Sequence, residues 1–214
     1  MSMIRSLILS SLCLLSACSQ AHLTSIALPS PKKQADIFPS GKYVLDDSHA
    51  SITLAVSHLG LSNYTMQFTN FDAKLTFDAE KPENSKLVAT VYMNSIETNY
   101  PNPSKKDFDK ELAYKNIWFN ANEYPTATFI SNKIKLTGEN TGIVYGDLTF
   151  LGITKPLELN VRFNGGFLKK PYVGVAALGF SADAILIRSN WGLDTYLPAI
   201  GDEVSIHMEC EFHK

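Results

Sequence analysis

Hydrophobic and polar residues alternate along most of the chain after Gly41. The alternation is cleanest near the C-terminus, where Val204, Ile206, Met208, Cys210 and Phe212 occupy one face and the intervening face is polar. A period of two places successive side chains on opposite faces of a β-strand. This segment therefore predicts a strand with one buried face and one solvated face.

The same period recurs often enough to predict an all-β domain. Further strands are predicted at residues 42–45, 51–58, 71–78, 86–94, 128–136, 142–150, 157–164 and 172–184, with Gly, Pro, Asn and Asp between them. Helices do not alternate with these strands, so we expect antiparallel pairing. A sheet of eight or nine strands protects its edges best by closing on itself. The sequence thus predicts a closed antiparallel β-barrel of about eight strands.

One short helical segment is predicted between Ser104 and Lys115. Ser104 is the expected N-cap, and Phe108 and Leu112 fall on one face of the helix. We expect this helix to lie against the side or the mouth of the barrel.

The interior of such a barrel is just wide enough to be filled by side chains or to hold one slim ligand. The residues expected to face inward include the small Ala89 and Ala182 and the large Phe77, Phe150, Phe163 and Phe180. This mixture permits a channel without requiring one. A membrane-spanning barrel would turn its apolar faces outward, and the period alone does not separate the two arrangements.

Residues 1–17 predict a lipoprotein signal peptide. Their apolar run, at 7–15, is too short to cross a bilayer as a permanent helix. The run ends in Leu15-Ser16-Ala17-Cys18, which resembles the bacterial lipobox, whose cysteine is acylated with fatty acids such as palmitate. An anchor on Cys18 would hold the protein to a membrane facing the periplasm, and Ser19 favours the outer membrane. An ordinary export signal with a chance cysteine is the alternative.

The remaining chain divides into a tether and a domain. Residues 18–40 contain three prolines, a basic pair and no sustained apolar period, which predicts a flexible tether. Residues 41–214 are the predicted barrel domain. With Cys13 in the signal and Cys18 acylated, Cys210 is left alone, so no internal disulfide is expected. Its apolar neighbours predict a buried, inert thiol.

Composition narrows the function classes. The chain has 214 residues, 45% of them hydrophobic, which is enough for one sizeable core. Its formal net charge of −2 gives no basic face of the kind that nucleic acid binding needs.

A few polar residues are candidates for chemistry. His58 has the parity of the apolar face of its segment, so it is either a hydrogen-bonded interior histidine or a contact to a ligand head group. Arg188 follows an apolar stretch, where its charge needs either a carboxylate partner such as Asp183, Asp194 or Asp202, or an anionic or carbonyl head group. Trp191 beside it either flanks the barrel mouth or simply packs.

No set of residues predicts catalysis or metal binding. His49 lies beside Asp46 and Asp47, but turn capping explains that cluster without a metal. The sequence shows no nucleophile with a matching base, no glycine-rich phosphate loop, and no spacing typical of metal ligands. We therefore expect neither a catalytic site nor a cofactor.

Several short motifs lie in a fixed order between Gly41 and Phe212. They are Tyr43-Val44-Leu45-Asp46-Asp47-Ser48-His49-Ala50, His58-Leu59-Gly60-Leu61-Ser62, Phe68-Thr69-Asn70-Phe71-Asp72, Tyr124-Pro125-Thr126-Ala127-Thr128-Phe129, Gly146-Asp147-Leu148-Thr149-Phe150-Leu151-Gly152-Ile153-Thr154-Lys155-Pro156, Gly179-Phe180-Ser181-Ala182 and Ile187-Arg188-Ser189. Together they resemble the YceI-like family of exported lipid-binding proteins. The resemblance implies a lipocalin-like barrel whose pore takes the tail of a polyprenyl lipid, such as a quinone or a polyprenyl phosphate.

These observations predict an exported lipoprotein that binds a long-chain isoprenoid lipid for storage or transport and is not an enzyme. The expected ligand contacts are His58, Phe77, Phe150, Phe163, Phe180, Ala182, Arg188 and Trp191. Two alternatives stay open: an enzyme that acts on the lipid head group through His58 and Arg188, and a cell-envelope interaction module with a packed interior. Association of two chains into a homodimer also stays open.

Overall fold

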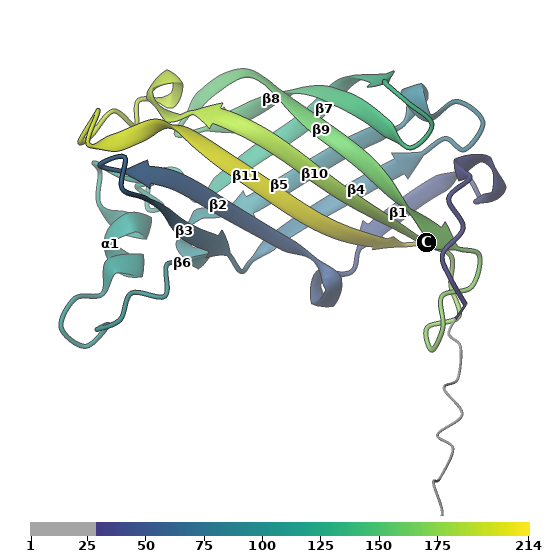
Figure 1. Ribbon diagram of the computed structural model, residues 1–214, viewed down its shortest axis with the longest axis horizontal. Coiled ribbons are helices and arrows are strands. Elements are labelled where there is room, and N and C mark those ends of the chain that lie inside the picture. The colour runs from purple at the N-terminus through teal and green to yellow at the C-terminus, as the bar shows by residue number, and fades with distance from the viewer. Residues whose placement is uncertain (1–28) are drawn as a thin grey trace, which may run out of the picture. The chain divides into compact units, whose positions relative to one another are not determined.

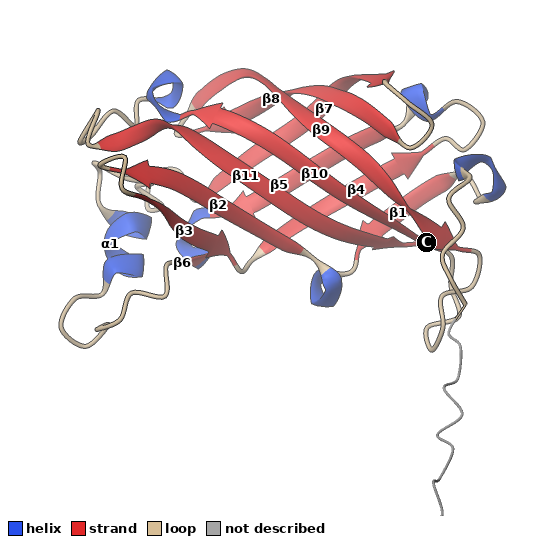
Figure 2. Ribbon diagram, viewed as in Figure 1, coloured by secondary structure: helices blue, strands red, loops and turns tan. Residues whose placement is uncertain are grey.

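The computed structural model describes residues 29–214, and its compact domain runs from Pro31 to Lys214 (Figures 1 and 2). The predicted signal peptide and Cys18 lie outside the described residues. Within the described part, one α-helix, α1 (Phe108–Tyr114), accompanies a large sheet. None of the helices described there is both long and apolar enough to span a membrane.

The sheet contains eleven strand segments in the described chain. They are β1 (Gly41–Leu45), β2 (Ser51–His58), β3 (Ser62–Phe68), β4 (Phe71–Phe77), β5 (Lys86–Tyr92), β6 (Ile96–Glu97), β7 (Thr126–Leu136), β8 (Thr141–Phe150), β9 (Ile153–Phe167), β10 (Ala177–Ile187) and β11 (Ile200–His213). Short 3-10 turns interrupt the chain at η1 (Ala35–Ile37), η2 (Asp47–His49), η3 (Pro82–Asn84), η4 (Met93–Ser95) and η5 (Arg188–Trp191).

The sheet closes into the predicted antiparallel barrel. Closure occurs because β1 pairs with β4 on one side and with β11 on the other. The N-terminal part of β11 pairs with β2 instead of β1. β1 and β2 are therefore two halves of one barrel strand, interrupted at η2. β3 with β4, and β5 with β6, are interrupted in the same way. Counting each interrupted pair once leaves eight barrel strands, which confirms the prediction.

Two details differ from the sequence expectations. β3 is absent from the predicted strands, although Tyr64, Met66 and Phe68 alternate with polar residues and carry the same period of two. The helix also starts later than expected. Asp107, rather than Ser104, is its N-cap, and the Asp107 carboxylate accepts a hydrogen bond from the Lys110 backbone N–H at 3.0 Å.

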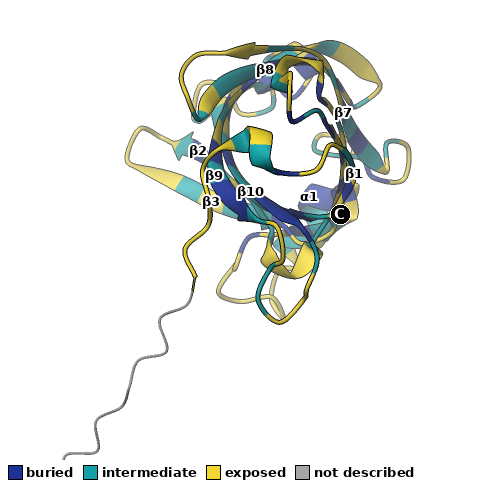
Figure 3. Cartoon of the chain, turned by 90° about the vertical axis from the view of Figure 1, so that its right-hand side faces the viewer, coloured by how far each residue is buried: buried dark blue, intermediate teal, exposed yellow. Residues whose placement is uncertain are grey.

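The barrel has two ends of different construction. One end, which we call the η1 end, is on the right in Figure 1. It holds η1, the C-terminus and the connections β4–β5, β7–β8 and β9–β10. The opposite end, which we call the α1 end, holds α1, η5, the β2–β3 hairpin and the β8–β9 turn. Figure 3 looks into the η1 end and shows the segment with η1 lying across the opening, with α1 at the far end.

The segment before β1 belongs to the barrel, which corrects the predicted tether. Phe38 is only 2% exposed and its ring meets that of Phe163 edge-on, with centroids 6.0 Å apart. Lys32 exchanges two backbone hydrogen bonds with Gly166, at 2.9 and 2.8 Å. The packed domain therefore begins at Pro31 rather than Gly41. The sequence did not indicate this packing, because residues 31–40 contain prolines and no hydrophobic period, and a few separate contacts such as those of Lys32 and Phe38 hold them to the barrel.

Candidate ligand-binding cavity

The barrel encloses a cavity of about 380 Å³, within the range of small-molecule sites. Its wall is almost entirely apolar and comes from the inward faces of the strands. The polar side chains in the lining are those of Asp72, Ser85, Glu139, Asn140, Thr141 and Arg188. Such a surface favours a ligand that is mostly hydrocarbon, because burying unpaired polar groups against it would cost free energy.

The structure places the residues predicted to face inward on this wall. Phe77, Phe150, Phe163 and Phe180 line the cavity, as do Ala89 and Ala182. The rings of Phe163 and Phe180 lie 5.3 Å apart between centroids, and Phe180 also contacts Phe212. The period of two therefore identified these side chains correctly, and the barrel is not filled by them.

Residues outside the period close the α1 end of the cavity. Leu112 comes from α1, and Trp118 and Phe119 come from the connection that follows it. The Phe119 ring lies 5.9 Å from that of Phe150 and 5.8 Å from that of Phe68, centroid to centroid. The sequence predicted the helix and its place at the side or mouth of the barrel, but not the plug that Trp118 and Phe119 add to close the cavity.

The η1 end of the cavity is polar and reaches solvent. Ser85 lies in the β4–β5 connection, and Glu139, Asn140 and Thr141 lie at the β7–β8 turn. Glu139 and Thr141 are exposed, and Ala35 from η1 completes the rim. Hydroxyl, amide and carboxylate groups at this rim can form hydrogen bonds with a polar group, whereas most of the remaining wall can make only apolar contacts.

Arg188 is a structural anchor at the start of η5. Its side chain is 4% exposed, and its guanidinium donates to three backbone carbonyls, those of Leu193, Ile200 and Gly201. Burial lowers the pKa of Arg188, and the charges of Asp202 and Asp194 partly offset this. Its direct partners are therefore backbone carbonyls of the loop before β11 and of the start of β11, and not the carboxylates considered from the sequence. Two guanidinium N–H groups remain beyond these three bonds.

Two other predicted contacts lie away from the cavity. His58 is exposed at the end of β2, so the expectation of an interior histidine is wrong. Its parity matches that of Ile52, Leu54 and Val56, but His58 is the last residue of β2, beside the hairpin and past a register shift in the pairing with β11. Trp191 is buried in the core and its Nε1–H donates to the Leu148 carbonyl at 3.3 Å, so it packs and does not flank a mouth.

Comparison with known proteins identifies the family. The sequence profile of the YceI-like domain matches residues 43–212. The chain belongs to the YceI-like family. A UPF0312 protein of Pseudomonas savastanoi pv. phaseolicola is 35% identical over 173 residues, which cover 80% of this chain and 86% of that protein.

Solved structures agree with the YceI-like fold. BcnA of Burkholderia cenocepacia matches with a TM-score of 0.65 at 23% identity, over 78% of this chain and 98% of BcnA. A polyisoprenoid-binding domain from Saccharophagus degradans matches with a TM-score of 0.56 at 13% identity, over 80% of this chain and 97% of that domain. At these identities the likeness establishes the shared architecture.

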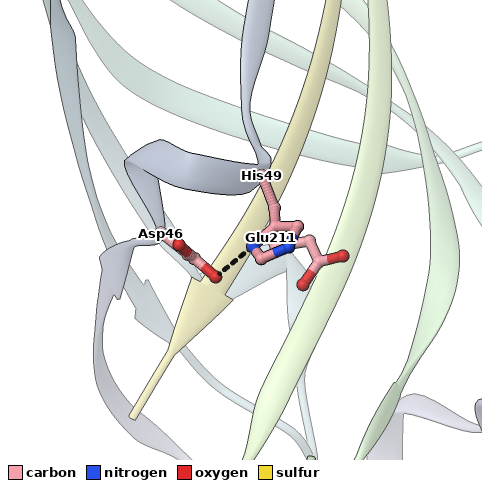
Figure 4. Close-up of side chains that lie close together, drawn as sticks. All are labelled: Asp46, His49 and Glu211. Atoms are coloured by element: carbon pink, nitrogen blue, oxygen red, sulfur yellow. Dashed lines mark hydrogen bonds and ion pairs between the residues drawn. The ribbon is translucent and has the colours of Figure 1, made fainter. Parts of the chain in front are cut away.

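A charged cluster lies outside the cavity of this YceI-like barrel (Figure 4). Asp46 accepts hydrogen bonds from the backbone N–H of Ser48 and meets His49 Nδ1 at 2.8 Å, which confirms turn capping. Glu211 lies close enough to join them as a metal ligand. However, the Lys170 ammonium already contacts the carboxylates of both Asp46 and Glu211. We therefore describe the cluster as an ion-pair network.

The electrostatics of this network are consistent with that assignment. Burial raises the pKa of Asp46, but hydrogen bonds from Ser48, His49 and Lys170 outweigh it and hold that pKa below its usual range. Burial lowers the pKa of Lys170, and Glu211 and Asp46 more than reverse this. Both groups are therefore charged at neutral pH, and the network links the β9–β10 connection to the C-terminal end of β11.

Cys210 should react with a bulky maleimide only after the YceI-like barrel unfolds. Its thiol lines the cavity, and burial raises its pKa to about 11, so thiolate is scarce at neutral pH. The measurement is the rate of labelling with and without denaturant, followed by mass spectrometry. Fast labelling of the native protein would show an accessible, reactive thiol and contradict the burial.

Tyr64→Phe should leave the stability unchanged or raise it by about 1 kcal/mol, because a buried group without a partner costs desolvation energy. The Tyr64 hydroxyl is buried and, among the described residues, has no hydrogen-bond partner. Its ring packs against Phe108 of α1, with centroids 6.1 Å apart, and phenylalanine keeps that contact. Urea unfolding of both proteins measures the difference. A clear loss of stability would mean that a bound water or ligand satisfies the hydroxyl.

Proposed function

We propose that this chain binds a long-chain isoprenoid lipid inside the barrel and acts in lipid storage or transport in the bacterial cell envelope. The observation that carries the proposal is the apolar cavity, which runs from the α1 plug to a polar rim at the η1 end. The polyisoprenoid binding printed for the Saccharophagus degradans domain supports the same class of ligand. A packed interaction module would lack such a cavity.

The chemistry of the wall suits an isoprenoid tail. Each isoprene unit adds five carbons, and apolar burial contributes about 25 cal/mol per Å². In this proposal Phe77, Phe150, Phe163 and Phe180 contact the tail, and Ala182 leaves room for it. The head group, either a quinone-type ring or a phosphate, lies at the η1 end, where Ser85, Asn140 and Thr141 offer hydrogen bonds.

Binding is favoured over catalysis by the placement of the candidate residues. An enzyme that used His58 and Arg188 would need both beside the ligand, but His58 is exposed outside the barrel lining. Arg188 uses three of its N–H groups on backbone carbonyls. Any contact that its remaining N–H groups make with a ligand would be an orienting one. The described cavity lining contains no histidine that could serve as a base.

Organic extraction of the purified protein tests the ligand. We expect mass spectrometry to find one dominant long-chain isoprenoid, near one molecule per chain, that survives purification. An apo sample obtained by denaturation, extraction and refolding is the control, and it should take up the same lipid from a mixture. A purified native protein that carries no lipid and takes up none would contradict the proposal.

The lipid anchor is the second part of the proposal and rests on the lipobox-like residues 15–18. Cys18→Ser should abolish acylation and move the mature protein from the membrane fraction to the soluble periplasm, with the barrel still folded. Two acyl chains make an anchor effectively stable, so the shift should be nearly complete. Fractionation after a high-salt wash measures it. A Cys18→Ser protein that stays membrane-bound would refute the anchor.

A further inference from the structure

An aromatic side chain is held fully in solvent at the η1 end. Tyr172, in the β9–β10 connection, is 97% exposed and has φ 66°, a left-handed conformation that is unfavourable for a bulky residue. Backbone hydrogen bonds fix the loop: Lys170 donates to Val175 and Gly174 donates to Lys170. No part of residues 29–214 covers the ring. The loop therefore presents a large aromatic ring to solvent at a cost in backbone strain.

The surroundings of Tyr172 combine apolar and basic residues. Leu168 and Val173 in the same loop are about half exposed, at 48% and 49%. The N-terminal segment lies beside this loop, since Lys32 pairs with Gly166, and it adds the exposed Lys32 and Lys33 (Figure 1). The two segments, residues 29–37 and 164–176, contain four lysines and one carboxylate, the exposed Asp36 of η1.

We propose that residues 168–175, with Lys32 and Lys33, dock on the surface of a bilayer that contains anionic lipids. Tyrosine and flanking lysines are typical of groups that sit at the membrane interface, with the ring among the head groups and the ammonium groups near phosphates. We call this surface the docking loop surface. Of its lysines, Lys170 is occupied by Asp46 and Glu211, which leaves Lys32, Lys33 and Lys169 for the lipid.

The chain that precedes the domain fits this orientation. The inference rests on the proposed function in one respect, the acylation of Cys18. Residues 19–30 separate Cys18 from Pro31, so even a fully extended connection spans only about 45 Å. The domain begins at Pro31, and its second residue, Lys32, pairs with Gly166 beside the docking loop surface. An anchored chain therefore keeps this end of the barrel within that distance of the membrane.

The orientation also gives the cavity a route to the bilayer. The polar rim through which the cavity reaches solvent lies at the same η1 end as the docking loop surface. A lipid tail could then pass between the bilayer and the barrel with little exposure to water, whose contact with a long tail is strongly unfavourable.

The α1 end offers a competing apolar surface. Leu59 and Leu61 of the β2–β3 hairpin and Tyr196 of the loop before β11 are exposed there. Leu59 lies against that loop, since its backbone N–H donates to Ala199. The residues 58–62 and 194–200 contain no lysine or arginine and include Asp194, so an anionic bilayer would not attract them. Tyr196, also at a positive φ, is therefore a matched control for Tyr172.

Site-specific fluorescence tests the docking. Tyr172→Cys and Tyr196→Cys variants of the non-acylated mature protein, both with Cys18→Ser, are labelled with an environment-sensitive dye. Native Cys210 is partly buried and its pKa is raised, so it competes little for the dye. Vesicles of phosphatidylethanolamine and phosphatidylglycerol are then added. We expect a blue shift and quenching by brominated lipids for the label at 172 and neither for the label at 196. Penetration at 196 alone, or at neither site, would overturn the proposal.

Charge removal gives a second readout. Replacing Lys32, Lys33 and Lys169 together by glutamine should weaken vesicle partitioning of the non-acylated protein by about tenfold or more, and salt should weaken the wild type similarly. The intact mass of each sample reports acylation, and its organic extract reports the ligand. A chain without acylation or lipid would refute the proposed function, while the dye at 172 would still decide the docking.

Discussion

Ala182→Trp should abolish lipid binding while leaving the barrel folded. Ala182 lies on β10 between Val161 of β9 and Met208 of β11, and its methyl group faces the cavity. An indole ring there occupies ligand space instead of removing a contact. We expect the co-purified lipid to be lost, with a fall in stability of about 1–3 kcal/mol if neighbouring side chains must strain to accept the ring.

Ile185→Trp is the matched control for this prediction. Ile185 is on the same strand but is 53% exposed, on the face that points away from the cavity. The same large residue should therefore leave the lipid content unchanged. Ala89→Trp on β5 tests the opposite wall and should behave like Ala182→Trp. A folded Ala182→Trp protein that keeps its lipid would place the ligand outside the barrel.

The period of two predicted the wall of the cavity but not its ends. Phe150 and Phe180 were assigned to the interior because alternation reports which face a side chain occupies, and that holds wherever the strand stays in the barrel. His58 shows the limit of this reasoning. Its parity is that of Val56, yet the strand has reached the hairpin, and the sequence contains no signal for the height at which the barrel stops.

The closures of the barrel depend on tertiary contacts between distant segments. Phe119 reaches Phe150, and Phe38 reaches Phe163, from segments that have no period of their own. Single aromatic anchors of this kind give no local pattern, so the plug was missed and residues 31–40 were predicted to be a tether. The polar rim at Asn140 could not be predicted for the same reason. The sequence marks Asn140 as a turn residue, but only the fold shows that this turn borders the cavity.

For Arg188, the sequence correctly predicted that the charge needs partners but suggested the wrong kind of partner. Arg188 follows an apolar run, and a buried charge without partners would cost free energy. The guanidinium instead donates to the backbone carbonyls of Leu193, Ile200 and Gly201. Asp202 instead accepts hydrogen bonds from the backbone and hydroxyl of Ser189. Backbone acceptors cannot be distinguished in a sequence, since every residue has one.

Arg188→Ala should destabilise the protein by about 3–5 kcal/mol, because three carbonyls lose their donor and each unsatisfied buried group costs about 1–3 kcal/mol before water relaxes part of it. The loss should be seen as a lower urea midpoint with an unchanged slope. Asp202→Asn is a milder control, since an amide oxygen still accepts from Ser189. It should cost clearly less than Arg188→Ala.

Lipid content then separates the two roles considered for Arg188. The tail contacts proposed for Phe163 and Phe180 do not involve this residue. Arg188→Ala protein that is kept folded at low temperature should therefore retain the proposed isoprenoid. Arg188→Lys restores the charge but not the planar fork that reaches three carbonyls, so it should recover little of the stability. A folded Arg188→Ala protein that has lost its lipid, with Arg188→Lys regaining it, would instead assign the guanidinium to the head group.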